Sequence, residues 1–358
     1  MASNINLTGE ITDFILLNLP AYWEKTASDA ASSGPPPFVL GVSGIQGSGK
    51  THLAARIEEI VKQPPFNMKP VVLSIDDLYK TYAEQKALAA SHPTNPLLQH
   101  RGQPGTHDLE LGAAIFDSLF HHRPTRIPSY DKSARDGQGD RTDPGTWTVA
   151  RTLPTEEYFA ALSTTPSPMS LDDRPVDMII FEGWCVGFRA LAPVDLERLW
   201  AASRAKQSPT SKLWRHDLKD LELINNSLLA YDVLTDKLDA LIHLFVHLFR
   251  SVGTFGSQDA DLCFSDAKDT QNVYDWRLEQ EAALRQRRGA GMTDEQVRAF
   301  VDGYYPAYEL YLEPLRQGGA FQRGGHGDDH GQSALNLPSK QLRILIDQHR
   351  KPIRVKPI

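Results

Sequence analysis

Eight consecutive residues have the types and spacing of a phosphate-binding loop. They are Gly44-Ile45-Gln46-Gly47-Ser48-Gly49-Lys50-Thr51, which match G-x-x-x-x-G-K-[ST] at every defined position. The glycines let the backbone wrap tightly, so that consecutive N–H groups converge on phosphate oxygens at the start of a helix. Lys50 is expected to reach the β- and γ-phosphates, and Thr51 to place its hydroxyl on Mg²⁺. The segment therefore predicts a site for a nucleoside triphosphate and its metal ion.

Carboxylates follow two apolar segments further along the chain. Asp76 and Asp77 come after Pro70–Ile75, and Glu182 comes after Val176–Phe181. Acids at the carboxyl end of a parallel strand face the ligand crevice. One aspartate can accept the proton of a substrate hydroxyl that attacks the γ-phosphate, although an Asp in this position can equally cap a helix. Glu182 has the place of an acid that binds Mg²⁺ directly or through water.

The purine-reading signature N-K-x-D of G proteins is absent from the sequence. Its absence argues against a GTPase switch and favours an ATP-dependent phosphotransferase. ATP and Mg²⁺ are therefore the expected cofactors.

Short apolar segments alternate with helical patterns, which predicts an α/β fold with a mostly parallel sheet. The expected strands are 38–43, 70–75, 176–181, 241–249 and 342–346. The expected helices are 51–62, 108–120, 218–238 and 272–288, with another amphipathic helix inside residues 1–24. The strand–loop–helix–strand order around Lys50 is a βαβ unit, which is the context that a phosphate loop requires.

Composition narrows the class of protein. The 358 residues carry 38 − 45 = −7 formal charges, which argues against a nucleic-acid or anionic-membrane partner. Cys185 and Cys263 are the two cysteines, too few for a disulfide framework. The first 37 residues lack the features of a secretory or transit peptide, and the apolar run Leu241–Phe249 is too short to span a bilayer. The sequence predicts a soluble cytoplasmic protein, with the nucleus not excluded.

Several longer motifs resemble a known group of enzymes. Asp76–Tyr79, Arg101–Asp108, Pro128–Asp131 and Phe181–Trp184 are similar to segments of the pantothenate kinase, uridine kinase and phosphoribulokinase group. Together with Lys132–Ala134, Gly139–Arg141, Val273–Glu279 and Gly291–Glu295, they more closely resemble the D-glycerate 3-kinase family of plants and fungi. The resemblance covers roughly residues 36 to 353. It implies a P-loop NTPase three-layer sandwich with a helical lid.

The resemblance also implies roles for individual residues. Asp76 would be the catalytic base and Asp77 a capping or supporting group, while Arg277 on the lid would contact the transferring phosphoryl group. The remaining acceptor contacts that it implies are Tyr79, Arg101, His107, Tyr130, Lys132 and Arg141. Simpler interpretations stay open: Arg101 as a surface charge pair, His107 as support for a helix start, and Lys132 as a solvated loop lysine. Arg277 can also be one of the arginines of any exposed helix.

The resulting prediction is an ATP-dependent small-molecule kinase that phosphorylates D-glycerate to 3-phosphoglycerate. The alternatives are a kinase of the same fold for pantothenate or a nucleoside, and an ATP-binding switch without phosphotransfer. Residues 1–37 are expected to form an N-terminal helix and linker, and 38–358 the kinase domain. Within that domain we expect an acceptor loop at 128–147, insertions at 203–215 and 253–271, and lid helices at 272–316. The paired histidines His243 and His247 are not expected to bind a metal ion.

Overall fold

The computed structural model describes residues 5–26, 35–150, 170–171, 174–246, 272–289, 291–322 and 338–358. The predicted insertion 253–271, together with Cys263 and His247, lies outside these described residues.

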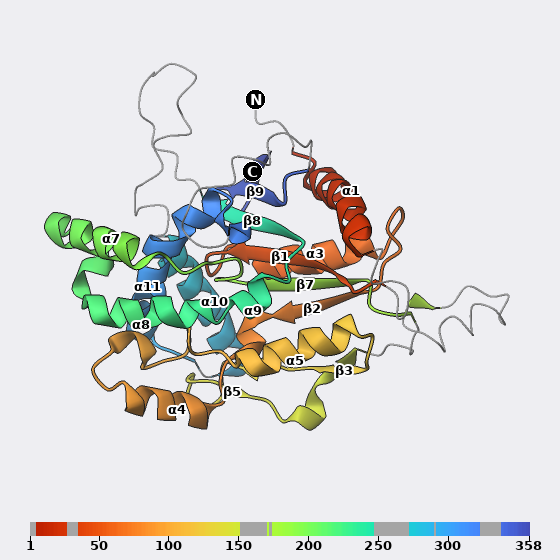
Figure 1. The fold of residues 1–358 in the computed structure, drawn as a ribbon. Helices are drawn as coiled ribbons and strands as arrows, with labels where there is room; N and C mark the ends of the chain where they lie inside the picture. The colour runs from red at the N-terminus through yellow and green to blue at the C-terminus, as the bar shows by residue number, and fades with distance from the viewer. Residues whose placement is uncertain are drawn as a thin grey trace, which may run out of the picture.

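A six-stranded sheet in the order β10-β9-β8-β1-β7-β2 forms the centre of the fold (Figure 1). Its parallel strands are β1 (Phe38–Gly44), β2 (Pro70–Ser74), β7 (Met178–Gly183), β8 (Ala240–Val246) and β9 (Gln341–Ile346). Each coincides with a predicted apolar segment, because strands covered on both faces read as continuous apolar runs. The sixth strand, β10 (Pro352–Pro357), pairs antiparallel with β9 and was not predicted, since this edge strand is only partly buried.

Helices cover both faces of the sheet (Figure 1). On one face α3 (Lys50–Val61) packs on β1, β2 and β7 and contacts α1 (Leu7–Thr26). On the other, Phe116 of α5 (Leu109–Phe120) meets Phe181 of β7 with ring centroids 5.4 Å apart. The predicted three-layer α/β fold is confirmed.

The N-terminal helix belongs to the same hydrophobic core as the sheet. Ile11, Phe14 and Ile15 of α1 are buried, and the ring of Tyr22 packs edge-on against Phe38 with centroids 5.3 Å apart. Burial of each such side chain stabilises the fold by about 1.5–3 kcal/mol. Helix α1 is therefore packed on the domain that the sequence assigned to residues 38–358.

The segment expected as a long loop contains short paired strands. Within it, β4 (Tyr130–Asp131) pairs with β5 (Asp140–Arg141). On its two flanks, β3 (Thr125–Ile127) pairs with β6 (Thr148–Ala150). The loop interpretation of 128–147 was wrong in this respect, because two-residue strands are too short to show an alternating pattern. The β4–β5 hairpin, which we call the acceptor hairpin, turns through 132–139.

One predicted helix is divided in the structure, and part of one predicted insertion is helical. The single helix expected over 218–238 is α8 (Leu218–Leu229) followed by the short α9 (Asp232–Thr235). The segment 203–215 comprises the end of α7 (Pro193–Lys206) and a 3₁₀ turn at Leu213–Arg215 whose first residue is buried. Among the described residues, the other α-helices are α4 (Tyr82–Ser91), α10 (Asn272–Arg288) and α11 (Asp294–Arg316).

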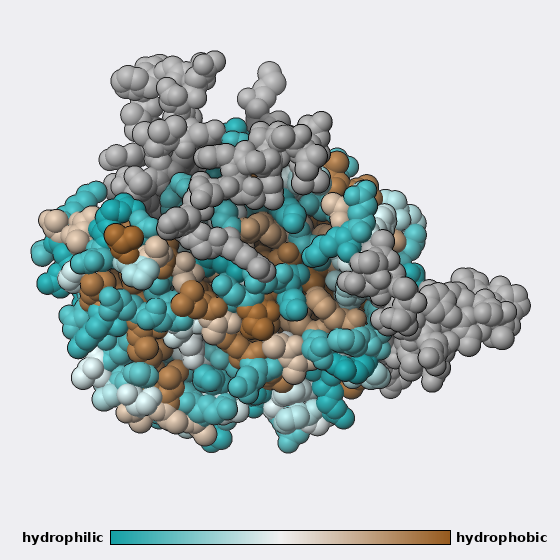
Figure 2. All heavy atoms as spheres, in the orientation of Figure 1, coloured by the Kyte–Doolittle hydropathy of each residue, from teal (hydrophilic) through white to brown (hydrophobic). Residues whose placement is uncertain are grey.

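The surface is mainly hydrophilic on the face displayed, where hydrophobic residues occur in several separate groups (Figure 2). Among the residues that the structure describes, no helix combines the length and apolar character needed to cross a bilayer.

Candidate active site

The phosphate loop follows β1 and leads into α3, as the sequence predicts. Gly49 has a left-handed backbone with φ of 96° and directly precedes the first turn of α3. Gly47 also has a positive φ, of 79°, and a Cβ atom there would lie 2.4 Å from Cβ of Trp276 on α10. Glycine is needed at both positions, at Gly49 for the turn and at Gly47 also for the close approach of α10.

Two tyrosines of α11 form hydrogen bonds with the phosphate loop, in addition to its contact with α10. The hydroxyl of Tyr308 accepts a hydrogen bond of 3.2 Å from the backbone N–H of Gln46, and Tyr304 donates its hydroxyl to the Gln46 side chain. The loop is therefore fixed between α10 and α11, which reach the carboxyl ends of the strands.

The side chains of Lys50 and Thr51 lie at the bottom of this loop. Lys50 donates to the Ile45 carbonyl over 3.1 Å. Burial lowers the pKa of this ammonium, while Glu182 and Asp76 oppose that effect. Thr51 donates its hydroxyl to Oε1 of Glu182 over 3.1 Å, so the two predicted metal ligands touch. A hydroxyl and a carboxylate suit Mg²⁺, which binds few protein oxygens and completes its shell with phosphate and water.

Asp76 lies in the short 3₁₀ turn Ile75–Leu78 that follows β2. The cap of this turn is Ser74, whose hydroxyl accepts from the Asp76 N–H over 3.3 Å, so the capping interpretation of the aspartates was wrong. Oδ2 of Asp76 accepts from Nζ of Lys132 over 2.5 Å, whereas its buried Oδ1 has no hydrogen-bond partner among the described residues. Burial alone would raise the pKa of Asp76, but the ammonium groups of Lys132 and Lys50 hold that pKa well below its usual range.

Asp77 points away from the pocket and holds the acceptor hairpin. Its Oδ1 accepts a hydrogen bond of 3.0 Å from the backbone N–H of Tyr130. Burial raises the pKa of Asp77 to about 6, although this hydrogen bond opposes the rise. The two neighbouring carboxyl groups therefore have different environments and different roles.

All of the predicted catalytic and metal-binding residues line one pocket. The predicted residues that line it are Gln46, Gly47, Lys50, Thr51, Asp76, Tyr79, Arg101, Lys132, Glu182 and Arg277. Residues from the phosphate loop, the ends of β2 and β7, the acceptor hairpin and α10 therefore converge on one site.

Arg101 and Arg277 both lie close to one aromatic ring. Their guanidinium carbons are 5.3 Å and 5.8 Å from the centroid of Phe300 on α11. Arg101 also donates to the carbonyls of Gly137 and Gln138 in the acceptor hairpin. Arg277 forms an ion pair of 2.9 Å with Glu281 one turn along α10. Both arginines are nearly buried, which makes the interpretation of either as an exposed surface charge wrong.

Three predicted acceptor contacts, His107, Tyr130 and Arg141, lie outside the pocket lining, as does Asp77. The buried ring of His107 stacks on Tyr79 with centroids 4.3 Å apart, and its Nδ1 is 2.6 Å from the Tyr231 hydroxyl. Burial lowers the pKa of His107 to about 3. Tyr130 packs edge-on against Tyr79, with centroids 5.4 Å apart. These groups are placed to support the pocket wall.

Arg141 is engaged in contacts within the protein. Its Nη2 donates to the Tyr79 carbonyl over 2.9 Å and to Oδ2 of Asp108 over 3.0 Å. The other carboxyl oxygen of Asp108 caps α5 by accepting from the Leu111 N–H. Arg141 therefore joins the acceptor hairpin to the start of α5.

Four lining residues had no role assigned from the sequence: Gly183, Trp184, Gln280 and Phe300. Trp184 directly follows Glu182 and Gly183 at the end of β7. This position next to a predicted metal ligand could have predicted that Trp184 lies in the site. Gln280 and Phe300 belong to amphipathic helices, where a polar or aromatic residue gives no local signal of a site.

Comparison with known proteins gives close relatives, although no protein-family model matches the sequence. The uncharacterized kinase mug58 of Schizosaccharomyces pombe is 32% identical over 320 residues, which cover 88% of this chain and 90% of that protein. The chloroplastic D-glycerate 3-kinase of Arabidopsis thaliana is 31% identical over 323 residues, covering 89% of this chain and 54% of that protein. The solved structure of D-glycerate 3-kinase from Cryptococcus neoformans superimposes with a TM-score of 0.70 at 27% identity, covering 99% of this chain and all of that one.

The sheet, the phosphate loop and the acids beside it define the class as a P-loop kinase that acts on a hydroxyl group. The relatives agree with this class over most of the chain. The chain belongs to the D-glycerate 3-kinase family.

Proposed function

We propose that this protein transfers the γ-phosphoryl group of ATP to the 3-hydroxyl of D-glycerate. The observation that carries the proposal is the buried Oδ1 of Asp76, which has no hydrogen-bond partner in the described part of the chain and lies in the pocket that also contains Lys50 and Thr51. A carboxylate oxygen in that position can accept a hydrogen bond from an acceptor hydroxyl while the phosphate loop holds ATP. The names of the Arabidopsis and Cryptococcus relatives favour D-glycerate as the acceptor.

The charges of the pocket suit a small hydroxy-acid. Lys132 and Arg101 lie beside Asp76, so the acceptor carboxylate can bind these cations while the far hydroxyl reaches Oδ1 of Asp76. Arginine favours such a ligand because its planar fork can bind two carboxylate oxygens. When the acceptor carboxylate draws Lys132 toward itself, the negative charge of Asp76 loses part of its compensation and its pKa rises. Acceptor binding thereby makes Asp76 a stronger base.

In the transfer, the acceptor oxygen forms a bond to the γ-phosphorus while the bond to the bridging oxygen of ATP breaks and ADP leaves. Asp76 takes the proton of the hydroxyl. Lys50 and Arg277 face the phosphoryl group, where their charges stabilise the transition state. When bound to Thr51 and Glu182, Mg²⁺ would neutralise charge on the β- and γ-phosphates. Helix α10 covers the phosphate loop and keeps water from the γ-phosphate.

The test is a measurement of ADP formation with D-glycerate, L-glycerate, pantothenate and uridine in parallel, followed by identification of the product by ³¹P NMR. We expect turnover with D-glycerate and 3-phosphoglycerate as the product. Turnover only with pantothenate or uridine would replace the acceptor and keep the kinase class. Binding of ATP without acceptor-dependent ADP would favour a switch. A cytoplasmic location is part of this proposal, and microscopy of the tagged full chain tests it.

A further inference from the structure

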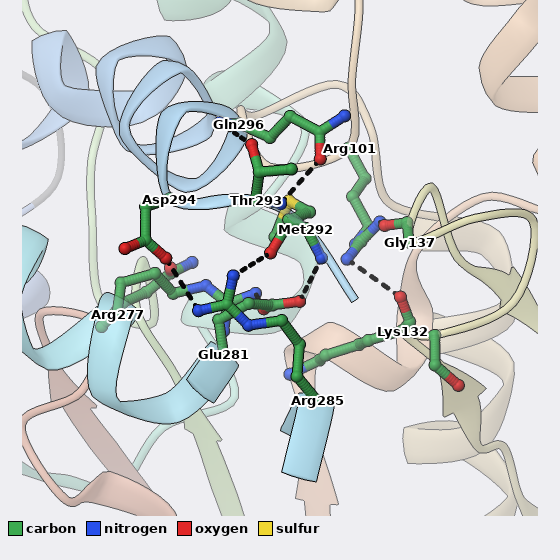
Figure 3. Close-up of polar contacts among 12 residues, drawn as sticks. Arg101, Lys132, Gly137, Arg277, Glu281, Arg285, Met292, Thr293, Asp294 and Gln296 are labelled. Atoms are coloured by element: carbon green, nitrogen blue, oxygen red, sulfur yellow. Dashed lines mark hydrogen bonds and ion pairs between the residues drawn. The ribbon is translucent and has the colours of Figure 1, made fainter. Parts of the chain in front are cut away.

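A carboxylate on α10 is buried deeper than the arginine that it accompanies. Glu281 is 1% exposed and lies one helical turn after Arg277. An unpaired buried carboxylate is costly, so its partners indicate what it does. Its Oε1 accepts the backbone N–H of Met292 over 2.8 Å, and its Oε2 lies 2.9 Å from Nη2 of Arg277 (Figure 3). Glu281 therefore joins Arg277 to the connection between α10 and α11.

A second arginine of this helix, Arg285, is held by partners other than Glu281. Arg285 donates to the Met292 carbonyl over 2.9 Å and forms an ion pair of 2.7 Å with Asp294 (Figure 3). The side chain of Arg277 is further confined by the ring of Phe300. Glu281 and Phe300 thus confine the guanidinium of Arg277 at the edge of the pocket.

The same turn also touches the acceptor hairpin. A Cβ atom on Gly137 would lie 3.4 Å from Cγ of Met292, so the hairpin and the turn are neighbours here. The Gly137 carbonyl accepts from Arg101 over 2.8 Å. The backbone of Gly291 passes directly over Glu281, because a Cβ there would lie 2.7 Å from Oε1. A contiguous set of contacts therefore runs from Arg277 through Glu281 and the turn to the acceptor side.

We propose that Glu281 is a positioning residue that orients Arg277 toward the transferring phosphoryl group and ties that orientation to the α10–α11 turn. It acts through Arg277 and does not itself touch the substrates. This inference rests on the proposed function and adds a residue whose role depends on its negative charge and its burial.

The test is a double-mutant cycle with Glu281→Gln and Arg277→Ala. The glutamine keeps an oxygen for the Met292 N–H and removes the charge that faces Arg277. We expect kcat to fall about tenfold in Glu281→Gln and about a hundredfold in Arg277→Ala, with both KM values within about threefold of wild type. In the double variant, kcat should equal that of Arg277→Ala within about twofold, because Glu281 acts through the missing arginine. Losses that multiply, or a Glu281→Gln kcat equal to wild type, would overturn the inference.

The matched control is Asp294→Asn, which removes the exposed partner of Arg285 in the same turn. It should leave kcat within about twofold of wild type, as surface ion pairs contribute little. The same double-mutant cycle can be measured without turnover. Calorimetry gives the affinity of each variant for ADP with aluminium fluoride and Mg²⁺, which together mimic the transferring phosphoryl group. We expect a loss of about tenfold in affinity for Glu281→Gln and no further loss on the Arg277→Ala background. If wild type turns over no acceptor, the proposed function fails, and this binding cycle still decides the role of Glu281.

Discussion

Nζ of Lys132 lies 2.5 Å from Oδ2 of Asp76, and this ion pair joins the acceptor hairpin to the end of β2. Lys132 is half exposed, at 49%, whereas Asp76 is 22% exposed. The lysine can therefore move toward an incoming carboxylate while the aspartate stays in place. This relationship allows one cation both to keep Asp76 ionised and to attract the acceptor.

Replacement of Lys132 should weaken acceptor binding. We expect Lys132→Ala to raise KM for D-glycerate by about ten- to a hundredfold, because a charged contact contributes roughly 1.5–3 kcal/mol. KM for ATP should change by less than about threefold. Steady-state kinetics with each substrate varied separately measure both values. Arg135→Ala is the control, since Arg135 lies in the same hairpin and pairs with Asp140 at the surface. If both substitutions raise KM for D-glycerate equally, Lys132 only stabilises the hairpin and does not contact the acceptor.

Replacement of Asp76 should reduce turnover more than it reduces ATP affinity. Asp76→Asn keeps the shape but cannot take a proton, and we expect kcat to fall about a hundredfold or more. Asp77→Asn should remain near wild type, because an amide oxygen can still accept from the Tyr130 N–H. Single-turnover kinetics and calorimetric ATP binding separate the two effects. A large loss in Asp77→Asn with a small one in Asp76→Asn would reverse the assignment of the base.

Arg141 should matter for stability more than for substrate binding. Arg141→Ala removes the bonds to the Tyr79 carbonyl and to Asp108, so we expect the free energy of unfolding to fall by about 1.5–3 kcal/mol. KM for D-glycerate should stay within about threefold of wild type. Urea unfolding and steady-state kinetics provide the two measurements. A KM increase comparable to that of Lys132→Ala would return Arg141 to the acceptor site.

The sequence predicts the central fold well because the parallel strands are buried on both faces. β1, β7 and β8 are buried along their whole length, and such strands leave continuous apolar runs. Edge strand β10 and the two-residue strands of the acceptor hairpin leave no such pattern. Their pairing depends on neighbours that are distant in the sequence, as with Tyr130 and Arg141.

The residues of the site also divide into those with a local sequence pattern and those placed by contacts distant in the sequence. Lys50, Thr51, Asp76 and Glu182 stand at the ends of strands or in a local motif, so the sequence could place them together. Phe300 and Glu281 act through contacts between helices, and those contacts depend on how α10 and α11 pack. Arg141 and His107 lie in motifs that resemble the family, yet the structure gives their polar atoms partners within the protein. The resemblance to the family predicted the region of the site. The structure then distinguished the residues that line the pocket from those, such as Arg141 and His107, that support its wall.

Buried histidines should make the protein less stable as the pH falls. Burial lowers the pKa values of His107 and His243 to about 3, so both rings stay neutral in the fold after the unfolded chain has begun to take protons near pH 6.5. A depressed pKa contributes stability that is present above the unfolded value and is lost as the pH falls from there toward 3. Each histidine contributes at most about 1.4 kcal/mol per pH unit in this window.

The measurement is urea unfolding between roughly pH 5 and 7, a range that limits the contribution of ordinary carboxyl groups. We expect His107→Gln to reduce the slope of the unfolding free energy against pH by up to one histidine's share, whatever its effect on absolute stability. His121→Gln is the matched control, because that ring is exposed at the end of α5. A slope for His107→Gln equal to that of wild type would mean that the ring takes a proton in the folded protein. The packing between Tyr79 and Tyr231 would then have to open near neutral pH, which would make the pocket wall itself responsive to acid.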